Sequence, residues 1–374
     1  MEPNTSPIRV LLMNSYSFEK IHDNWKKGIN PSHYLMGKVE LEKKGDFIID
    51  IHQHQKFSWL NKLGRVFKIQ LLDQQVRALF KLRKYDILYL PYPFANSRLI
   101  TLLKWAKLIR IPIVILVHQN SLYGLKEDSL FKKISLKRMA QFDAFAFFSK
   151  ALMERLKGEF GWSEEEYKRK FFHIHWGPDS EFYKKIKPAA PEGEKPFAVC
   201  AGTMDRDYNM LFDAFRDLNY DLKVFCTPTT IPQYTDIPSN ISIDTSWVPY
   251  TQLLEAYKRA SFIIIPLYES IKNKGHTYGL TVLLDAIAVG KPVIMTYHPY
   301  IDIDIERENI GVWVRKNDVE GWKVKLKELI AMEEEREQMG TNAKNLHLNK
   351  VNIDRFADEM EKIFKSVLAR EGEV

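Results

Sequence analysis

Cysteine is scarce in this chain: only Cys200 and Cys226 occur among 374 residues, and they lie in two separate apolar segments. Two thiols cannot build the disulfide framework of a small secreted protein or supply a metal site. No apolar run reaches the roughly 18 residues that a membrane-spanning helix needs. The opening residues, MEPNTSPIRVLLMNS, have neither a basic leader nor a small-residue cleavage site. These absences favour a cytoplasmic protein with buried, reduced thiols.

Several nucleotide-binding and catalytic motifs are also absent. Met13-Asn14-Ser15-Tyr16 follows the first expected strand, where the G-x-G-x-x-G of a nicotinamide or flavin enzyme would stand. There is no Walker A sequence, no G-x-S-x-G elbow and no zinc-ligand spacing. No signature of a nucleic-acid-binding module is present, so a nucleic-acid partner is not expected. His52 and His54 alternate at a strand end and form a weak candidate metal pair, but a polar loop rim is the favoured explanation.

The chain is rich in apolar residues and in positive charge. Hydrophobic residues make up 45% and charged residues 28%, as is typical of a globular protein long enough for two domains. The formal net charge of +7 suits nucleic acid, an anionic membrane or a phosphorylated substrate. Residues 56–68 interleave cations with large apolar groups, which is typical of an amphipathic helix on an anionic bilayer. An exposed helix whose lysine stems cover apolar surface explains this segment equally well.

Apolar runs of strand length alternate with segments of helical spacing along the chain. Strands are predicted at residues 9–13, 47–52, 85–90, 113–117, 142–148, 172–175, 197–201, 222–226, 241–245, 262–266 and 292–296. Helices are predicted at residues 32–44, 99–108, 150–160, 210–218, 250–258, 281–289 and 352–368. Such alternation indicates an α/β protein with parallel sheets and helices on both faces.

The stretch KKIKPAAPEGEKP, residues 184–196, combines prolines, a glycine and many charges, which is typical of an interdomain linker. We therefore expect an N-terminal domain over residues 1–184, a linker over 185–196 and a C-terminal domain over 197–350. The amphipathic last helix, within residues 351–374, is expected to pack across the two domains.

A candidate phosphate site follows the strand at residues 197–201. Gly202 and Thr203 come directly after the strand, and Arg206 stands just before the next helix. In open α/β sheets ligands bind beyond the carboxyl ends of the strands. Backbone N–H groups at a helix start favour an anion, and an arginine adds a planar fork of donors. A surface arginine after a strand is also common, and that alternative stays open.

A second candidate lies before the helix at residues 281–289. The loop LYESIKNKGHTYG carries Lys272, Lys274 and His276 and ends at Gly279, so its cations and the helix start suit a diphosphate. Asp285 lies further along this helix among apolar residues. Its carboxylate could accept two hydrogen bonds from a ribose diol, and a simple solvated acid is the alternative.

His118 follows the strand at residues 113–117, at the edge where ligands are expected. There it could hydrogen-bond a sugar hydroxyl or act as a base. The alternative is a histidine that hydrogen-bonds to the backbone at the strand end.

Three segments stand out together with the order of the elements. They are residues 172–183, FHIHWGPDSEFY, residues 201–214, AGTMDRDYNMLFDA, and residues 279–294, GLTVLLDAIAVGKPVI. They resemble the retaining glycosyltransferases of the GT-B fold, closest to glycosyltransferase family four (group 1). The resemblance implies two Rossmann-like domains that face each other across a cleft, with a C-terminal helix that crosses back to the first domain.

The resemblance also implies roles for particular residues. Arg206 takes the place of the cation that binds the donor diphosphate, Asp285 that of the acid that holds the ribose, and His118 that of the histidine beside the donor sugar. Thr277 stands where the family has its sugar-side carboxylate, and Thr203 stands where it has an arginine. The predicted catalytic residues are His118 and Arg206. The predicted donor site comprises Gly202, Thr203, Arg206, Lys272, Lys274, His276, Tyr278, Gly279, Leu280, Thr281 and Asp285. The predicted acceptor site comprises Ser15, Tyr16, His33 and Trp59.

The implied activity is transfer of a hexose from a UDP- or GDP-sugar to an acceptor hydroxyl, with retention. No metal is required where cations and a helix start neutralise the leaving diphosphate. A glycan or lipid-linked acceptor is expected, in glycan, polysaccharide or glycolipid assembly, with peripheral contact to an anionic membrane at its inner face. A soluble acceptor is the alternative. Because Thr277 replaces a carboxylate, a protein or epimerase of the same fold that binds a nucleotide sugar without transferring it is the second hypothesis.

Overall fold

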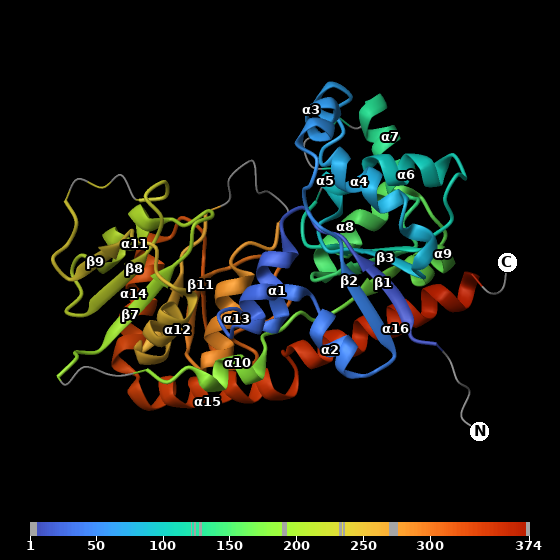
Figure 1. Ribbon diagram of the computed structural model, residues 1–374. Coiled ribbons are helices and arrows are strands. Elements are labelled where there is room, and N and C mark those ends of the chain that lie inside the picture. Colours follow the sequence, from blue (N-terminus) through green and yellow to red (C-terminus); the bar gives the residue numbers. More distant parts are fainter. Residues whose placement is uncertain are drawn as a thin grey trace. The chain divides into compact units, whose positions relative to one another are not determined.

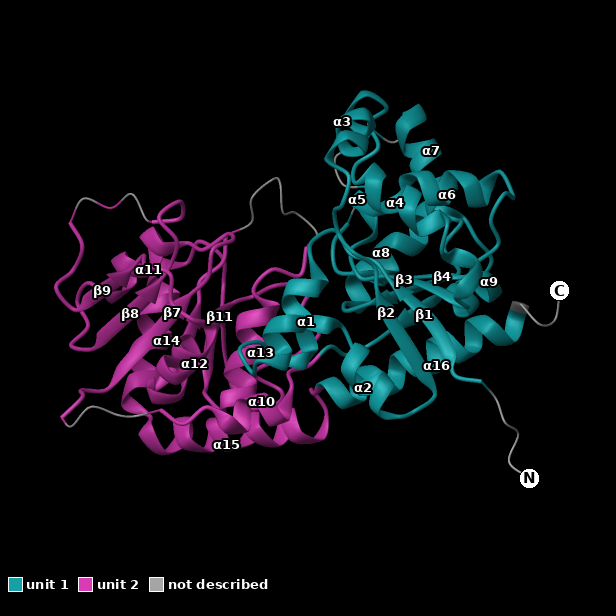
Figure 2. Ribbon diagram, in the orientation of Figure 1, with its two compact units in different colours: residues 1–176, 353–374 teal, residues 177–352 magenta. Residues whose placement is uncertain are grey.

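The computed structural model describes residues 6–120, 122, 125–126, 129–188, 193–231, 234, 236–268 and 276–371. The chain forms two compact units (Figure 2): unit 1 consists of residues 1–176 and 353–374, and unit 2 of residues 177–352. Each unit is built on one six-stranded sheet. The chain passes from unit 1 to unit 2 between residues 176 and 177, before the boundary at residue 184 that the sequence predicted. The proline-rich stretch 185–196 therefore lies inside unit 2.

The sheet of unit 1, of which Figure 1 labels β1, β2 and β3, has the strand order β2-β1-β3-β4-β5-β6, and all neighbours are parallel. Its strands are β1 (Ile8–Leu12), β2 (Phe47–Ile51), β3 (Ile87–Leu90), β4 (Ile113–Val117), β5 (Ala144–Phe147) and β6 (Phe171–His173). Its α-helices are α1 (Phe18–Lys26), α2 (Lys38–Lys43), α3 (Ser58–Val66), α4 (Leu72–Leu79), α5 (Pro93–Asn96), α6 (Arg98–Trp105), α7 (Leu130–Met139), α8 (Lys150–Phe160), α9 (Glu164–Lys170) and α16 (Ile353–Glu371). The strand order changes direction between β1 and β3, which creates a switch point there.

Helix α16 belongs to unit 1 although it is the last helix of the chain (teal in Figure 2). Phe356, Met360 and Phe364 recur at helical spacing and are all buried. The ring of Phe364 lies 5.3 Å from the ring of Tyr89, which comes from β3. The predicted return of the last helix to the first domain is therefore confirmed.

The sheet of unit 2 has the strand order β12-β11-β10-β7-β8-β9, again with parallel neighbours. Its strands are β7 (Phe197–Ala201), β8 (Asp221–Phe225), β9 (Ile241–Asp244), β10 (Phe262–Ile265), β11 (Val293–Thr296) and β12 (Gly311–Val314). Its helices are α10 (Ser180–Lys185), α11 (Tyr208–Phe215), α12 (Tyr250–Arg259), α13 (Leu280–Val289), α14 (Val319–Ala331) and α15 (Glu333–Asn349). This is the doubly wound order of dinucleotide-binding folds, and its switch point lies between β7 and β10.

One predicted helix is interrupted in the structure, and helices α1, α4, α5, α7, α9, α10, α14 and α15 were not predicted from the sequence. The helix predicted at residues 32–44 is split into a 3₁₀ turn, η1 (Ser32–Leu35), and helix α2. Met36 and Gly37 have φ angles of 50° and 83°, and this left-handed backbone interrupts the helix. Strand β12 was also not predicted from the sequence.

The predicted amphipathic segment 56–68 contains helix α3, which covers Ser58–Val66, and this segment presents apolar side chains to solvent. Trp59 is 61% exposed, Val66 74% and Phe67 61%. Lys62 and Arg65 on the same helix are exposed as well. The described residues contain no helix that is both long and apolar enough to span a membrane.

Candidate functional site

The loops after β7 and β10 meet at the switch point of the unit 2 sheet. The Asp207 backbone N–H donates to the carbonyl of Pro266 at 2.9 Å, and the Tyr268 N–H donates to the carbonyl of Asp205 at 3.1 Å. Arg206 and Leu267 form an antiparallel bridge between the same loops. Residues that follow two adjacent strands are thereby held side by side at the carboxyl edge, where α/β sheets bind ligands.

Gly202 and Arg206 are packed against each other in the first of these loops. Gly202 has a φ of +140°, which favours glycine, and a Cβ placed on it would lie 2.5 Å from the Arg206 Nη2 atom, so a larger residue would displace the guanidinium. Arg206 Nε donates to the carbonyl of Ala201 at 3.2 Å, and Nη1 donates to that of Met204 at 2.8 Å. These bonds hold the guanidinium over the loop and leave further N–H groups for an anion. Thr203 is exposed beside it.

Helix α13 begins next to this loop. Gly279 precedes the helix with a φ of +86°, and a Cβ there would lie 3.1 Å from Leu267 Cδ1 and 3.0 Å from Met295 Cε. No side chain caps the helix, so the N–H groups of its first turn, which begins with Leu280 and Thr281, have no side-chain acceptor. The Leu280 N–H donates to the carbonyl of Thr277 at 3.3 Å. The helix start therefore combines the next amide donors of the first turn, which no described side chain caps, with the positive end of the helix dipole.

The loop that leads to α13 is described in part. Lys272 and Lys274 lie outside the described residues. His276 is half-buried, and burial lowers the pKa of its imidazole, with Asp205 opposing that shift. Tyr278 is buried, and its ring lies edge-on to the ring of His298, with 4.4 Å between the ring centres.

Asp285 is buried, with only 3% of its surface exposed, so a solvated acid is the wrong interpretation. Its Oδ1 atom accepts a hydrogen bond from the Tyr183 hydroxyl at 2.5 Å and another from the Tyr250 hydroxyl at 2.7 Å. The two hydroxyl oxygens lie 2.6 Å apart. Burial raises the pKa of Asp285 to about 7, although the two tyrosine hydrogen bonds act to lower it.

The two tyrosines were missed by the sequence analysis. Tyr183 comes from α10 and Tyr250 from the start of α12, so they are 102 and 35 residues away from Asp285. No spacing rule connects positions so far apart. Their only signal is that a buried acid requires hydrogen-bond donors from neighbouring elements.

In unit 1, predicted residues gather at the switch point between β1 and β3. Tyr92, which follows β3, lies between them: its ring centre is 5.2 Å from that of Tyr16 and 4.3 Å from that of His118. His118 is half-buried after β4. The structure thus brings His118 and Tyr16 together through a tyrosine that the sequence analysis did not select.

The other predicted acceptor residues are spread more widely. The Ser15 carbonyl accepts a hydrogen bond from His54 Nε2 at 2.7 Å. His33 is 2% exposed and packs against Trp176, with 5.6 Å between ring centres. Trp59 lies on the exposed helix α3. Ser15 and the first residue of α3 line a common cavity, whereas His33 lies in a buried aromatic cluster.

His52 is only 2% exposed, so the polar rim that the sequence favoured for the histidine pair is wrong for this residue. His52 Nε2 donates to the carbonyl of Gln74 at 3.0 Å, and His54 Nε2 is bonded to the backbone as described above. Within the described ranges, no three His, Cys, Asp or Glu side chains gather as a possible metal-ligand set.

Comparison with known proteins agrees with this architecture. Residues 241–346 match the family model described as "Glycosyl transferases group 1", a range that contains α13 and Asp285. No curated protein gives a significant sequence match.

Solved structures match the whole chain. A glycosyltransferase from Rickettsia africae ESF-5 has a TM-score of 0.65 at 14% identity, covering 97% of this chain and 99% of its own. Sucrose-phosphate synthase from Thermosynechococcus elongatus has a TM-score of 0.67 at 13% identity, covering 97% and 100%. Anabaena Alr3699/HepE in complex with UDP-glucose has a TM-score of 0.64 at 12% identity, covering 96% and 100%. The chain therefore has the GT-B fold, and its residues 241–346 match the glycosyl transferases group 1 model.

Proposed function

We propose that this protein is a retaining hexosyltransferase that uses a UDP- or GDP-sugar and acts in glycan, polysaccharide or glycolipid assembly. The proposal is carried by the convergence of Gly202, Arg206 and the start of α13 at the switch point of unit 2. The group 1 match over α13 supports glycosyl transfer. A similar fold in a protein that was crystallised with UDP-glucose supports a nucleotide-sugar donor.

The site accounts for the departure of the diphosphate. As the bond between the sugar and the diphosphate breaks, negative charge develops on the leaving oxygens. The remaining N–H groups of Arg206 and the first-turn amides of α13 stabilise that charge, because they are already oriented before the reaction. His276, with a lowered pKa, adds a neutral imidazole near the same loop. These groups lead us to propose transfer without a metal ion. The role proposed for His118, a hydrogen bond to the sugar, rests on the resemblance.

Asp285 is proposed to bind the nucleotide ribose, as the resemblance implies. A ribose diol that reaches this carboxylate has to compete with Tyr183 and Tyr250 for Oδ1 or bind the other oxygen. The raised pKa fits a carboxylate that lacks water and gains from further hydrogen-bond donors.

The test is a panel of UDP-, GDP- and ADP-sugars, with nucleotide release as the readout. Arg206→Ala should lower kcat/KM by about 100-fold, since it removes a donor to the leaving group. Arg216→Ala is the matched control, because Arg216 is an arginine of the same unit that pairs with Asp236 at 2.7 Å. Equal rates in both variants would contradict the proposed role of Arg206, and absence of nucleotide release from every donor would contradict transfer.

The second candidate function is nucleotide-sugar binding without transfer, or epimerisation, in the cytoplasm. It is favoured by Thr277, which replaces the carboxylate expected on the sugar side. Calorimetry with the same panel separates the two: a donor that binds tightly but releases no nucleotide with any acceptor supports this second function.

We further propose that α3 contacts the anionic inner face of a membrane, where a glycan or lipid-linked acceptor would be met. Exposed Trp59, Val66 and Phe67 would enter the headgroup region, and the neighbouring cations would meet anionic lipid. Replacing these three residues with serine should abolish flotation with phosphatidylglycerol vesicles. Phe80→Ser is the control, because Phe80 is 84% exposed outside α3. A wild-type protein that fails to float would overturn the membrane proposal.

A further inference from the structure

A cavity of about 460 Å³ opens at the carboxyl edge of the unit 1 sheet. Ser15, Tyr92 and Gln119 line it, and they follow β1, β3 and β4. It therefore lies at the switch point between β1 and β3, and its volume is within the range of small-ligand sites. Through Tyr92 the cavity adjoins His118.

Three cations from separate elements line this cavity: Lys68 follows α3, Arg98 is the first residue of α6, and Arg138 is in the last turn of α7. Among the residues that the structure describes, no acidic side chain lines it. Nor does any described Asp or Glu form an ion pair with one of the three cations. Three positive charges thus share one cavity, and none of the described residues supplies a counter-charge there.

Both guanidinium groups are held in place by neutral acceptors. Arg98 Nη1 donates to the carbonyl of Lys68 at 2.7 Å, and Arg138 Nε donates to the Thr101 hydroxyl at 3.2 Å. Each bond fixes one N–H group of an arginine that has five, so donors remain for a ligand. Burial, and to a smaller extent the nearby Arg98, lowers the pKa of Arg138 to about 10. Arg138 remains charged at neutral pH, and an anion between the two arginines would relieve their repulsion.

We infer that this cavity binds the phosphate or diphosphate group of the acceptor, so that the acceptor of the proposed transferase is a phosphorylated compound. Two arginine forks and a lysine match the geometry and the multiple charge of a phosphoryl group better than a single carboxylate. That the bound phosphate belongs to an acceptor rests on the proposed function. The binding of an anion in this cavity does not depend on sugar transfer.

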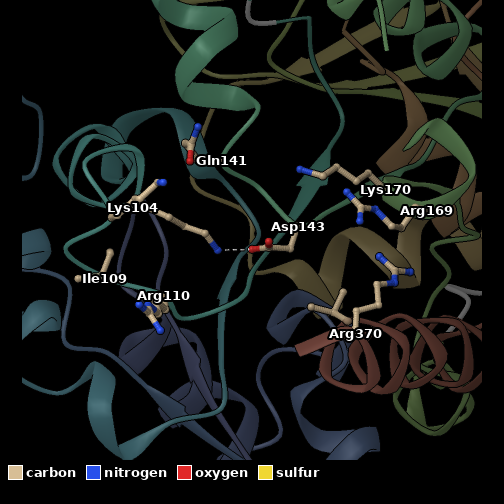
Figure 3. A pocket seen from close by; sticks show the side chains of 10 residues that line it. Lys104, Ile109, Arg110, Gln141, Asp143, Arg169, Lys170 and Arg370 are labelled. Carbon is tan, nitrogen blue, oxygen red and sulfur yellow. Dashed lines mark hydrogen bonds and ion pairs between the residues drawn. The ribbon is translucent and has the colours of Figure 1, made fainter. Parts of the chain in front are cut away.

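A second basic cavity of the same unit supplies a control (Figure 3). It lies at the opposite, amino ends of the strands, where Asp143 precedes β5 and Lys170 precedes β6. Lys104 there donates to Asp143 at 2.5 Å, and Lys170 donates to two backbone carbonyls. Arg110 and Arg169 line this cavity and can be replaced without touching the carboxyl edge.

The experiment is calorimetric titration of the full-length protein with inorganic pyrophosphate, in the presence of saturating UDP or GDP to occupy the donor site. The double variant Arg98→Gln/Arg138→Gln should lose affinity by roughly tenfold or more, because it removes two charge-assisted donors. Arg110→Gln/Arg169→Gln should retain wild-type affinity. The thermal unfolding midpoints of both variants are measured first, and Arg138→Lys, which keeps the charge, should retain part of the affinity.

Two competitors then separate the sources of the phosphate. Displacement of pyrophosphate is tested with polyprenyl phosphate in phosphatidylcholine vesicles and, separately, with soluble glucose 1-phosphate. Displacement by either compound supports the site and shows whether the phosphate belongs to a lipid or to a soluble acceptor. Displacement by neither, or equal pyrophosphate affinity in Arg98→Gln/Arg138→Gln and the wild type, overturns the inference. Failure of the proposed function is seen separately, as absence of nucleotide release from every donor.

Discussion

Replacing Asp285 with asparagine should stabilise unit 2 by an amount that grows with pH. Burial raises the carboxyl pKa from 3.8 to about 7. A raised folded-state pKa means that folding favours the protonated carboxyl group. The stability that wild-type Asp285 contributes is therefore fully present below about pH 4 and is lost as the pH rises through about 7. The difference between the two pKa values corresponds to about 4 kcal/mol in the fully ionised state. Between about pH 5 and about pH 8 the free energy of unfolding that the wild type loses to ionisation of Asp285 grows by about 2–3 kcal/mol.

Urea denaturation of the full-length wild type and of Asp285→Asn, followed by tryptophan fluorescence, measures this cost at the two pH values. Asparagine keeps the shape of the side chain and an oxygen that accepts from a tyrosine, but it carries no charge. Asp221→Asn, the same replacement at an exposed position of β8, is the matched control. If the stability gap between Asp285→Asn and wild type is the same at both pH values, the carboxylate is not desolvated and the reasoning is refuted.

Three further predictions concern the donor-side residues. Tyr183→Phe and Tyr250→Phe should each lower the free energy of unfolding by about 1.5–3 kcal/mol near pH 8, where the acceptor is ionised. Urea denaturation should show a smaller loss for either change in the Asp285→Asn background, and equal losses would argue against the bond. Gly279→Ala should cost about 1–2 kcal/mol, since φ is +86° and the new Cβ would lie 3.0 Å from Met295 Cε; an unchanged thermal midpoint would contradict this. Asp285→Ala should weaken nucleotide binding by about 1–3 kcal/mol in calorimetry if the acid holds the ribose, and unchanged affinity would leave it a structural role alone.

The strands were largely predictable because their signal is local. The run at residues 113–117 is β4, and the run at 197–201 is β7, with the predicted bounds. Both are uniformly apolar and buried at every position, as is typical of a parallel strand covered on both faces. Since polar residues follow such strands at a common edge, the positions of Gly202 and His118 at the two carboxyl edges also followed from the sequence.

What the sequence did not predict depends on contacts between distant segments. Tyr183 and Tyr250 meet Asp285 only because three helices of unit 2 converge. Arg98 and Arg138 come from different helices, α6 and α7. The hydrogen bond that joins these helices, from Arg138 to Thr101, connects residues 37 positions apart in the sequence. In the linear sequence these arginines are indistinguishable from the many cations of a chain with a net charge of +7. What distinguishes them is their shared cavity, in which no described residue supplies an acid, and that is a property of the fold.

The place of α16 bears on how this protein is made. The unit that begins the chain also contains its last helix, so residues 177–352 are an insertion within unit 1. On the ribosome, unit 2 can fold as soon as it has emerged, whereas unit 1 has to wait with the surface later covered by Phe356, Met360 and Phe364 exposed. A nascent chain stalled after residue 352 should therefore hold a folded second unit and an unfinished first one, a state that chaperones recognise by its exposed apolar surface.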